Sequence, residues 1–256
     1  MEAVVHKPCN GTEQYCKDRI EQILRMSPEE LAAYDKRVTD RINKLEEDTI
    51  CRNFENSLPP SIYNELKNCR FDNYKAENEY QKKASTQMLN EASNIASGKH
   101  RFIVLCGKSG IGKSHLMVST DWFIRHSVKG KYNDEKFYYS AMYVLSDEMA
   151  SDFKKCDSFT SGITKEEVTM KYTGLDVLLL DEFGKFKSPY EVDGLFRIIN
   201  AMQKKSLIIG TNMDKPDFEK YITGAIQDRL NASGIYISLD GIESYRPKLY
   251  RGNNND

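Results

Sequence analysis

The chain has 256 residues, of which 39% are hydrophobic and 29% are charged. This composition is typical of a folded domain with a polar surface, and the length allows one large domain with a smaller appendage. The formal net charge of -1 excludes a bulk attraction to nucleic acid, so any such contact requires a local patch. No long apolar run or signal-like N-terminus occurs. We therefore expect no membrane span and a cytoplasmic protein.

The six cysteines include no CxxC pair. In a cytoplasmic chain we expect reduced thiols. Cys9, Cys16 and the nearby His6 leave a zinc site open as a less favoured alternative, because their spacing matches no common zinc pattern.

Residues 1–57 are predicted to form a small helical domain. A strong helix start lies at Ser27-Pro28-Glu29-Glu30, where Ser27 can cap, Pro28 suits the first helical position and Glu30 can bond back. Apolar residues then recur at spacings of three and four, which predicts an amphipathic helix. They are Leu31, Tyr34, Val38, Ile42 and Leu45. With a shorter helix at about 13–25, this domain either packs on itself or docks on a partner, and we favour docking.

Beyond a break at Leu58-Pro59-Pro60, residues 58–80 are predicted to be a linker segment. Strands are then predicted at Phe102–Cys106, Ala141–Leu145, Val177–Leu180, Leu207–Gly210 and Ile235–Leu239. Helices are predicted at Gly112–Val128, Asp147–Lys155, Tyr190–Gln203 and Asp217–Leu230. This alternation indicates an α/β domain over residues 81–250, with a parallel five-stranded sheet between helices and a tail at 251–256.

One segment fits the phosphate-binding pattern GxxxxGK[ST]. It consists of Gly107, Lys108, Ser109, Gly110, Ile111, Gly112, Lys113 and Ser114. Its glycines let backbone N–H groups surround phosphate oxygens, and the helix that follows directs its positive end there. Lys113 can reach the β- and γ-phosphates, and the Ser114 hydroxyl can bind Mg²⁺. ATP with Mg²⁺ is the predicted ligand, and an ordinary glycine-rich turn is disfavoured by the strand before it and the helix after it.

A second motif is the strand Val177–Leu180, which delivers Asp181 and Glu182 to the carboxyl edge of the sheet. Asp181 is predicted to hold Mg²⁺, and Glu182 to orient and activate the attacking water. The alternative is a solvated strand end.

Three further polar positions are candidates for the same reaction. Asn212, or Thr211 beside it, ends the fourth strand and can bond the γ-phosphate or the water, unless it only starts a turn. Arg229 and Arg246 follow the fourth and fifth strands, where either could reach a phosphate, Arg229 from an adjacent subunit. An arginine supplied in this way is worth about 10³–10⁵ in rate, although most arginines only solvate a surface.

With these residues in place, the chain resembles the bacterial and phage helicase loaders of the DnaC/DnaI type and the related IstB transposition helpers, over about residues 58–247. The shared motifs are Cys69-Arg70-Phe71-Asp72-Asn73-Tyr74, Gly112-Lys113-Ser114-His115-Leu116, Leu180-Asp181-Glu182-Phe183-Gly184, Asp228-Arg229-Leu230 and Ser244-Tyr245-Arg246. The resemblance implies an AAA+ domain that assembles into an open or spiral ring around single-stranded DNA. It implies Arg229 as arginine finger, Arg246 as second sensor, and His115 as part of the nucleotide-binding segment.

The resemblance also implies a DNA-contacting step after the acidic pair. Ser188-Pro189-Tyr190 looks like the Ser-x-Tyr step of the loaders, and a tyrosine can stack on bases without sequence preference. Lys185 and Lys187 beside it are predicted to meet phosphates. The alternative for Tyr190 is an aromatic that packs at a helix start.

The chain departs from the family in three respects. The helix before the fourth strand lacks the family's arginine near its end, for which Lys204 or Lys205 could substitute. The cysteine spacing of zinc-binding loaders is absent. Only ten residues follow Arg246, so we expect a reduced lid.

Our leading hypothesis is therefore an AAA+ ATPase that loads a hexameric replicative helicase onto single-stranded DNA during replication. Its N-terminal helices would dock on the helicase, and its turnover would be slow because Arg229 comes from a neighbouring subunit. One alternative is an IstB-like transposition helper that binds duplex DNA and a transposase. Another is an AAA+ adaptor without nucleic acid.

Overall fold

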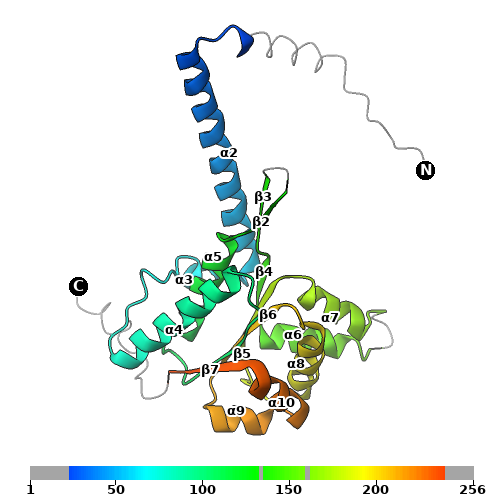
Figure 1. Ribbon diagram of the computed structural model, residues 1–256. Coiled ribbons are helices and arrows are strands. Elements are labelled where there is room, and N and C mark those ends of the chain that lie inside the picture. Colours follow the sequence, from blue (N-terminus) through cyan, green and yellow to red (C-terminus); the bar gives the residue numbers. More distant parts are fainter. Residues whose placement is uncertain (1–22, 133–134, 159–161, 240–256) are drawn as a thin grey trace, which may run out of the picture. The chain divides into compact units, whose positions relative to one another are not determined.

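The structure is a computed structural model that describes residues 23–132, 135–158 and 162–239 (Figure 1). The chain forms two compact units, Met1–Cys51 and Arg52–Asp256. The candidate zinc residues, the greater part of the predicted helix at 13–25, Arg246 and the tail lie outside the described residues. In the parts of the chain that the structure describes, no helix combines the length and the apolar character that a membrane crossing requires.

The described part of the first unit is dominated by helix α2 (Pro28–Ser57), which continues into the second unit. Its start confirms the predicted capping box. The Ser27 amide donates to Glu30 Oε2 at 2.8 Å, and the Glu30 amide donates to Ser27 Oγ at 3.2 Å. These bonds lower the pKa of the Glu30 carboxyl. Four residues of the predicted apolar stripe are exposed, namely Leu31, Val38, Ile42 and Leu45.

The second unit is built on a parallel five-stranded sheet, as predicted. Its strands are β1 (Phe102–Cys106), β4 (Ala141–Leu145), β5 (Val177–Phe183), β6 (Ser206–Thr211) and β7 (Gly234–Ser238), in the order β4-β5-β6-β1-β7. The central strands are almost uniformly apolar because helices cover both faces. Since β6 lies between β1 and β5, the strand ends that carry the predicted motifs are neighbours.

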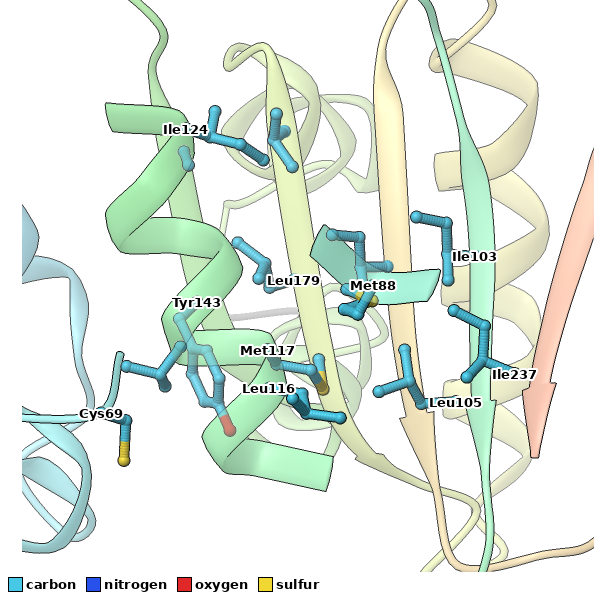
Figure 2. Close-up of a cluster of buried hydrophobic side chains, with 14 of the residues drawn as sticks. Cys69, Met88, Ile103, Leu105, Leu116, Met117, Ile124, Tyr143, Leu179 and Ile237 are labelled. Atoms are coloured by element: carbon cyan, nitrogen blue, oxygen red, sulfur yellow. The ribbon is translucent and has the colours of Figure 1, made fainter. Parts of the chain in front are cut away.

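Alternate residues of each strand enter two separate cores. Ile103, Leu105 and Leu179 pack under α4 (Glu79–Ala96) and α5 (Lys113–Arg125) on one face (Figure 2). The other face packs on five further helices (Figure 1). They are α6 (Ser146–Lys155), α7 (Lys165–Thr173), α8 (Pro189–Ala201), α9 (Lys215–Tyr221) and α10 (Gly224–Ser233).

Several boundaries differ from the prediction. The single helix predicted at 217–230 is two helices, α9 and α10, because Ile222 and Thr223 have extended backbone between them. The helix predicted to reach Val128 ends at Arg125, and a hairpin of β2 (Val128–Tyr132) and β3 (Glu135–Tyr138) follows it. Helices α4 and α7 were not predicted.

The linker segment is a packed part of the second unit. It contains the short helix α3 (Tyr63–Leu66), and both Leu58 and Cys69 are buried in the core cluster that includes Phe54. Its polar and aromatic composition suggested a loose connection. Its few apolar residues are instead spaced so that they meet α5.

Candidate active site

The predicted phosphate loop connects β1 to α5 in a backbone conformation that requires glycine. Gly107 has φ 137° and Gly112 has φ 98°, both in the region that side chains disfavour. A Cβ on Gly112 would lie 2.8 Å from the Tyr74 ring, and one on Gly107 would lie 2.6 Å from Ile111 Cδ1. No side chain caps the start of α5 at Gly112, so the first N–H groups of the helix can donate hydrogen bonds to phosphate oxygens.

Lys113 lies across the mouth of this loop. Its ammonium donates to the carbonyl oxygens of Gly107 and Lys108 at 2.7 and 2.8 Å, and to Asn212 Oδ1 at 2.9 Å. The residue is only 6% exposed. Since phosphate oxygens are stronger acceptors than carbonyl oxygens, this buried ammonium is suited to bind the terminal phosphate groups of a nucleoside triphosphate.

Asp181 is buried beside the loop, where three donors hold its carboxylate. Ser114 Oγ donates to Oδ2 at 2.5 Å, Tyr143 OH donates to the same oxygen, and the Glu182 amide donates to Oδ1 at 2.8 Å. Burial, and next the charge of Asp181, raise the pKa of the Tyr143 hydroxyl well above its usual value, so it remains a neutral donor. A Cβ on Gly210 would lie 2.2 Å from Oδ1, so only glycine leaves room for the carboxylate.

Sequence reasoning missed Tyr143. It lies on β4, the strand beside β5, and its register partner is Leu179. The available signal was its position in an otherwise aliphatic strand, where a buried tyrosine needs a partner for its hydroxyl.

Glu182 owes its position to an irregularity in β5. The ladder to β6 pairs Leu180 with Ile209 but Phe183 with Thr211, so β5 has one extra residue there. Glu182 has φ 57°, in the left-handed region, and its side chain is one-third exposed at the cleft. Both adjacent carboxylates line the cleft, but Asp181 is only 2% exposed and Glu182 is one-third exposed.

Of the two candidates at the end of β6, the cleft contains Asn212. Thr211 is fully buried, and its hydroxyl donates to the Phe183 carbonyl oxygen at 2.8 Å. Thr211 therefore fixes β6 to the end of β5, whereas Asn212 contacts Lys113 between the loop and the acidic pair.

These residues line a cleft of about 660 Å³. One end is polar and consists of residues 109–114 of the phosphate loop with Asp181, Glu182 and Asn212. The linker segment forms much of the remaining wall, to which it contributes Ile62, Leu66, Cys69 and Tyr74. Burial raises the pKa of the Cys69 thiol to about 11 and that of the Tyr74 hydroxyl to about 12, so both are neutral. We call this part of the cleft the linker wall. It also includes the polar residues Glu65, Asn73 and Lys75, and its apolar and aromatic residues suit contact with a flat organic base.

The linker wall is held against α5 by ring contacts. The Arg70 guanidinium lies 3.4 Å from the centroid of the Trp122 ring. His115 lines the cleft, and its Nε2 hydrogen-bonds the Arg70 carbonyl oxygen at 3.0 Å. The Tyr74 ring meets His115 edge to face, with the centroids 5.2 Å apart. Although the motif Cys69–Tyr74 was noted in the sequence, its role in the cleft depends on contacts that only the fold creates.

The two predicted arginines lie outside this arrangement. Arg229 is exposed on α10, 6.0 Å from the centroid of the Phe196 ring, and does not line the cleft of its own chain. Arg246 lies outside the described residues. The roles of both arginines remain predictions.

The predicted DNA-contacting residues lie on the turn between β5 and α8 and at the start of α8. Ser188 caps α8 in a capping box with Glu191, and Tyr190 is half-buried against the second core. Lys185 and Lys187 are exposed. Between them lies Phe186, which is 61% exposed and which the sequence analysis did not single out.

Comparisons with known proteins decide the family. The bacterial DnaA ATPase domain family matches residues 67–240. The chain is 30% identical over 195 residues to the replicative helicase loader DnaC of Buchnera aphidicola subsp. Acyrthosiphon pisum, covering 73% of this chain and 72% of the relative. The chain belongs to the DnaC-type AAA+ ATPases. The predicted family, fold and ATPase activity are thereby confirmed.

Solved structures agree on the fold. A DnaC helicase loader superimposes with a TM-score of 0.52 at 16% identity, covering 67% of this chain and 96% of that one. A replication initiator DnaA bound to AMPPCP and single-stranded DNA gives a TM-score of 0.52 at 20% identity, covering 72% of this chain and 54% of that one.

Proposed function

We propose that this DnaC-type protein loads a hexameric replicative helicase onto single-stranded DNA in the cytoplasm, under the control of ATP. The observation that supports the proposal most is the convergence of Lys113, Asp181, Glu182 and Asn212 in one cleft, in a chain related to a replicative helicase loader. ATP binding and hydrolysis at such a site would change how strongly the protein binds its partner and DNA.

The residues present fit a magnesium ion. Ser114 Oγ and Asp181 Oδ2 are 2.5 Å apart beside the phosphate loop, and hydroxyl and carboxylate oxygens are ligands that Mg²⁺ prefers. When bound there, the ion would neutralise charge on the β- and γ-phosphates. Tyr143 and the Glu182 amide hold the Asp181 carboxylate ready for this role.

The side chains divide the remaining work. Lys113 binds phosphate oxygens, Asn212 keeps the ammonium in place and orients the γ-phosphate or the water, and Glu182 accepts the proton of the attacking water. Arg229 of a neighbouring subunit in a ring or spiral would complete the site, which makes turnover slow for a single subunit.

The exposed apolar stripe of α2 supports docking on the helicase. Ile42 is 50% exposed and Leu45 is 57% exposed, with Leu31 and Val38 on the same side of the helix. An amphipathic helix that presents such a stripe fits a hydrophobic groove on another protein. Single-stranded DNA as the second partner is supported by the family and by the exposed basic turn after β5.

Capture of the cognate helicase by the full-length protein tests this proposal. We expect Ile42→Asp with Leu45→Asp to abolish capture and leave ATP binding intact, whereas Lys36→Asp with Asn43→Asp, on the opposite side of the helix, should retain both. Failure of the unsubstituted protein to retain the helicase at micromolar concentration would overturn the proposal. A preference for duplex over single-stranded DNA would instead favour a transposition helper.

A further inference from the structure

One buried amide side chain extends the linker wall into the first turn of α4. Gln81 is the third residue of that helix, lines the cleft and is only 4% exposed. Asn73 and Lys75, which line the same part of the cleft, are exposed. Gln81 therefore belongs to the inner surface of the cleft, whereas these two residues belong to its rim.

Two hydrogen bonds fix the orientation of this amide. The Glu77 backbone N–H donates to Gln81 Oε1 at 2.6 Å, and the Gln81 backbone N–H donates to Asn78 Oδ1 at 2.9 Å. Because a backbone N–H can only donate, the atom that faces Glu77 has to be the amide oxygen. The amide nitrogen, with its two N–H donors, is left to meet a ligand. The inner surface of the cleft thus offers a hydrogen-bond donor that a flip of the amide cannot turn into an acceptor.

A donor at this place distinguishes the two common purine bases. With the phosphates at Lys113, the ribose lies between them and the base, so the edge of the base farthest from the ribose enters the linker wall deepest. In adenine the nitrogen N1 on that edge is an acceptor, whereas in guanine N1 carries a hydrogen and is a donor. The Gln81 amide can therefore pair with adenine, but guanine would leave two buried donors facing each other, which costs binding free energy.

We propose that Gln81 is a specificity-determining residue of the ATPase: its amide N–H donates to N1 of adenine and excludes guanine nucleotides. This assignment deepens the proposed function and rests on it, because it requires a nucleotide whose phosphates lie at Lys113 and whose base lies at the linker wall. The same side chain holds the start of α4 through Glu77, so the helix that covers the core also sets which base the cleft accepts.

Analogues of ATP test the assignment on the unsubstituted full-length protein, by displacement of a fluorescent nucleotide. In 1-deaza-ATP a C–H group replaces N1, and we expect its affinity to be about tenfold lower than that of ATP, as for one lost hydrogen bond in a buried site. In 7-deaza-ATP the N1 acceptor remains, so its affinity should stay within about a factor of two of that of ATP. Equal affinities for ATP and 1-deaza-ATP would overturn the assignment, as would a loss that occurs with 7-deaza-ATP instead.

Gln81→Glu separates base recognition from the structural role of the side chain. It keeps an oxygen for the Glu77 N–H but replaces the amide donor with an acceptor. Affinity for ATP should fall about 10- to 100-fold, the preference for ATP over GTP should be lost or reversed, and affinity for inorganic triphosphate should not change. Gln87→Glu is the matched control, because it makes the same change at an exposed position of α4 that does not line the cleft.

An unchanged ratio of ATP affinity to GTP affinity in folded Gln81→Glu would overturn the assignment. If this variant does not fold, the analogue series on the unsubstituted protein decides. Failure of the proposed function would look different: helicase capture would be absent while the discrimination against 1-deaza-ATP and GTP persisted.

Discussion

The two ends of the cleft are built by different means. At the phosphate end, the glycine backbone and the buried hydrogen bonds of Lys113 and Asp181 leave no room for larger side chains. A Cβ on Gly210, for example, would lie 2.2 Å from Asp181 Oδ1. At the linker wall, side chains from residues 62–74 lean on α5 through ring contacts around Arg70 and His115. The first end can recognise any triphosphate, and the second can distinguish the base attached to it. Inorganic triphosphate has no base, so its affinity reports on the phosphate end alone, whereas the affinity for ATP reports on both ends.

The largest effect is expected from Lys113→Ala. It removes a charged donor from the phosphate end, so affinity for ATP and for inorganic triphosphate should both fall about 10- to 100-fold. Titration calorimetry or displacement of a fluorescent nucleotide measures both ligands. The control is Lys82→Ala, because Lys82 is exposed on α4 and does not line the cleft. Full retention of affinity would contradict the assignment of the loop.

A smaller effect is expected from Arg70→Ala, which removes the guanidinium stacked on Trp122 and loosens the linker wall. Affinity for ATP should fall about two- to thirtyfold, the range for a cation–ring contact, while affinity for triphosphate should stay within a factor of two. Equal losses for the two ligands would mean that the ends of the cleft are not independent.

The smallest effect is expected from pH. Burial lowers the pKa of His115, so the folded protein favours the neutral ring. The contribution of the neutral His115 ring to the stability of the folded protein is therefore complete above the unfolded pKa of about 6.5. It is lost as the pH falls below that value toward the folded pKa. ATP affinity should decline over this range more than triphosphate affinity does. In His115→Asn, ATP affinity and triphosphate affinity should depend on pH in the same way. If the two ligands still differ in pH dependence as they do in the unsubstituted protein, His115 does not contribute to base binding.

The sequence predicts the phosphate end of the cleft better than the linker wall. The phosphate loop and the strand that ends in Asp181 and Glu182 are local patterns, and sheet order then brings Asn212 between them. The linker wall and Tyr143 depend on contacts between residues far apart in the chain, so periodicity could not reveal them. The break between α9 and α10 was missed because the apolar pattern continues through it.

The stacking of Arg70 on Trp122 has a practical consequence. Trp122 is the only tryptophan of the chain, and a guanidinium lies 3.4 Å from its ring centroid at the point where the linker wall meets α5. A cation so close to an indole alters its emission, so the protein has an intrinsic fluorophore at this contact. Any ligand that shifts the linker wall will change that signal, and the occupancy of the base can be followed in the unlabelled protein.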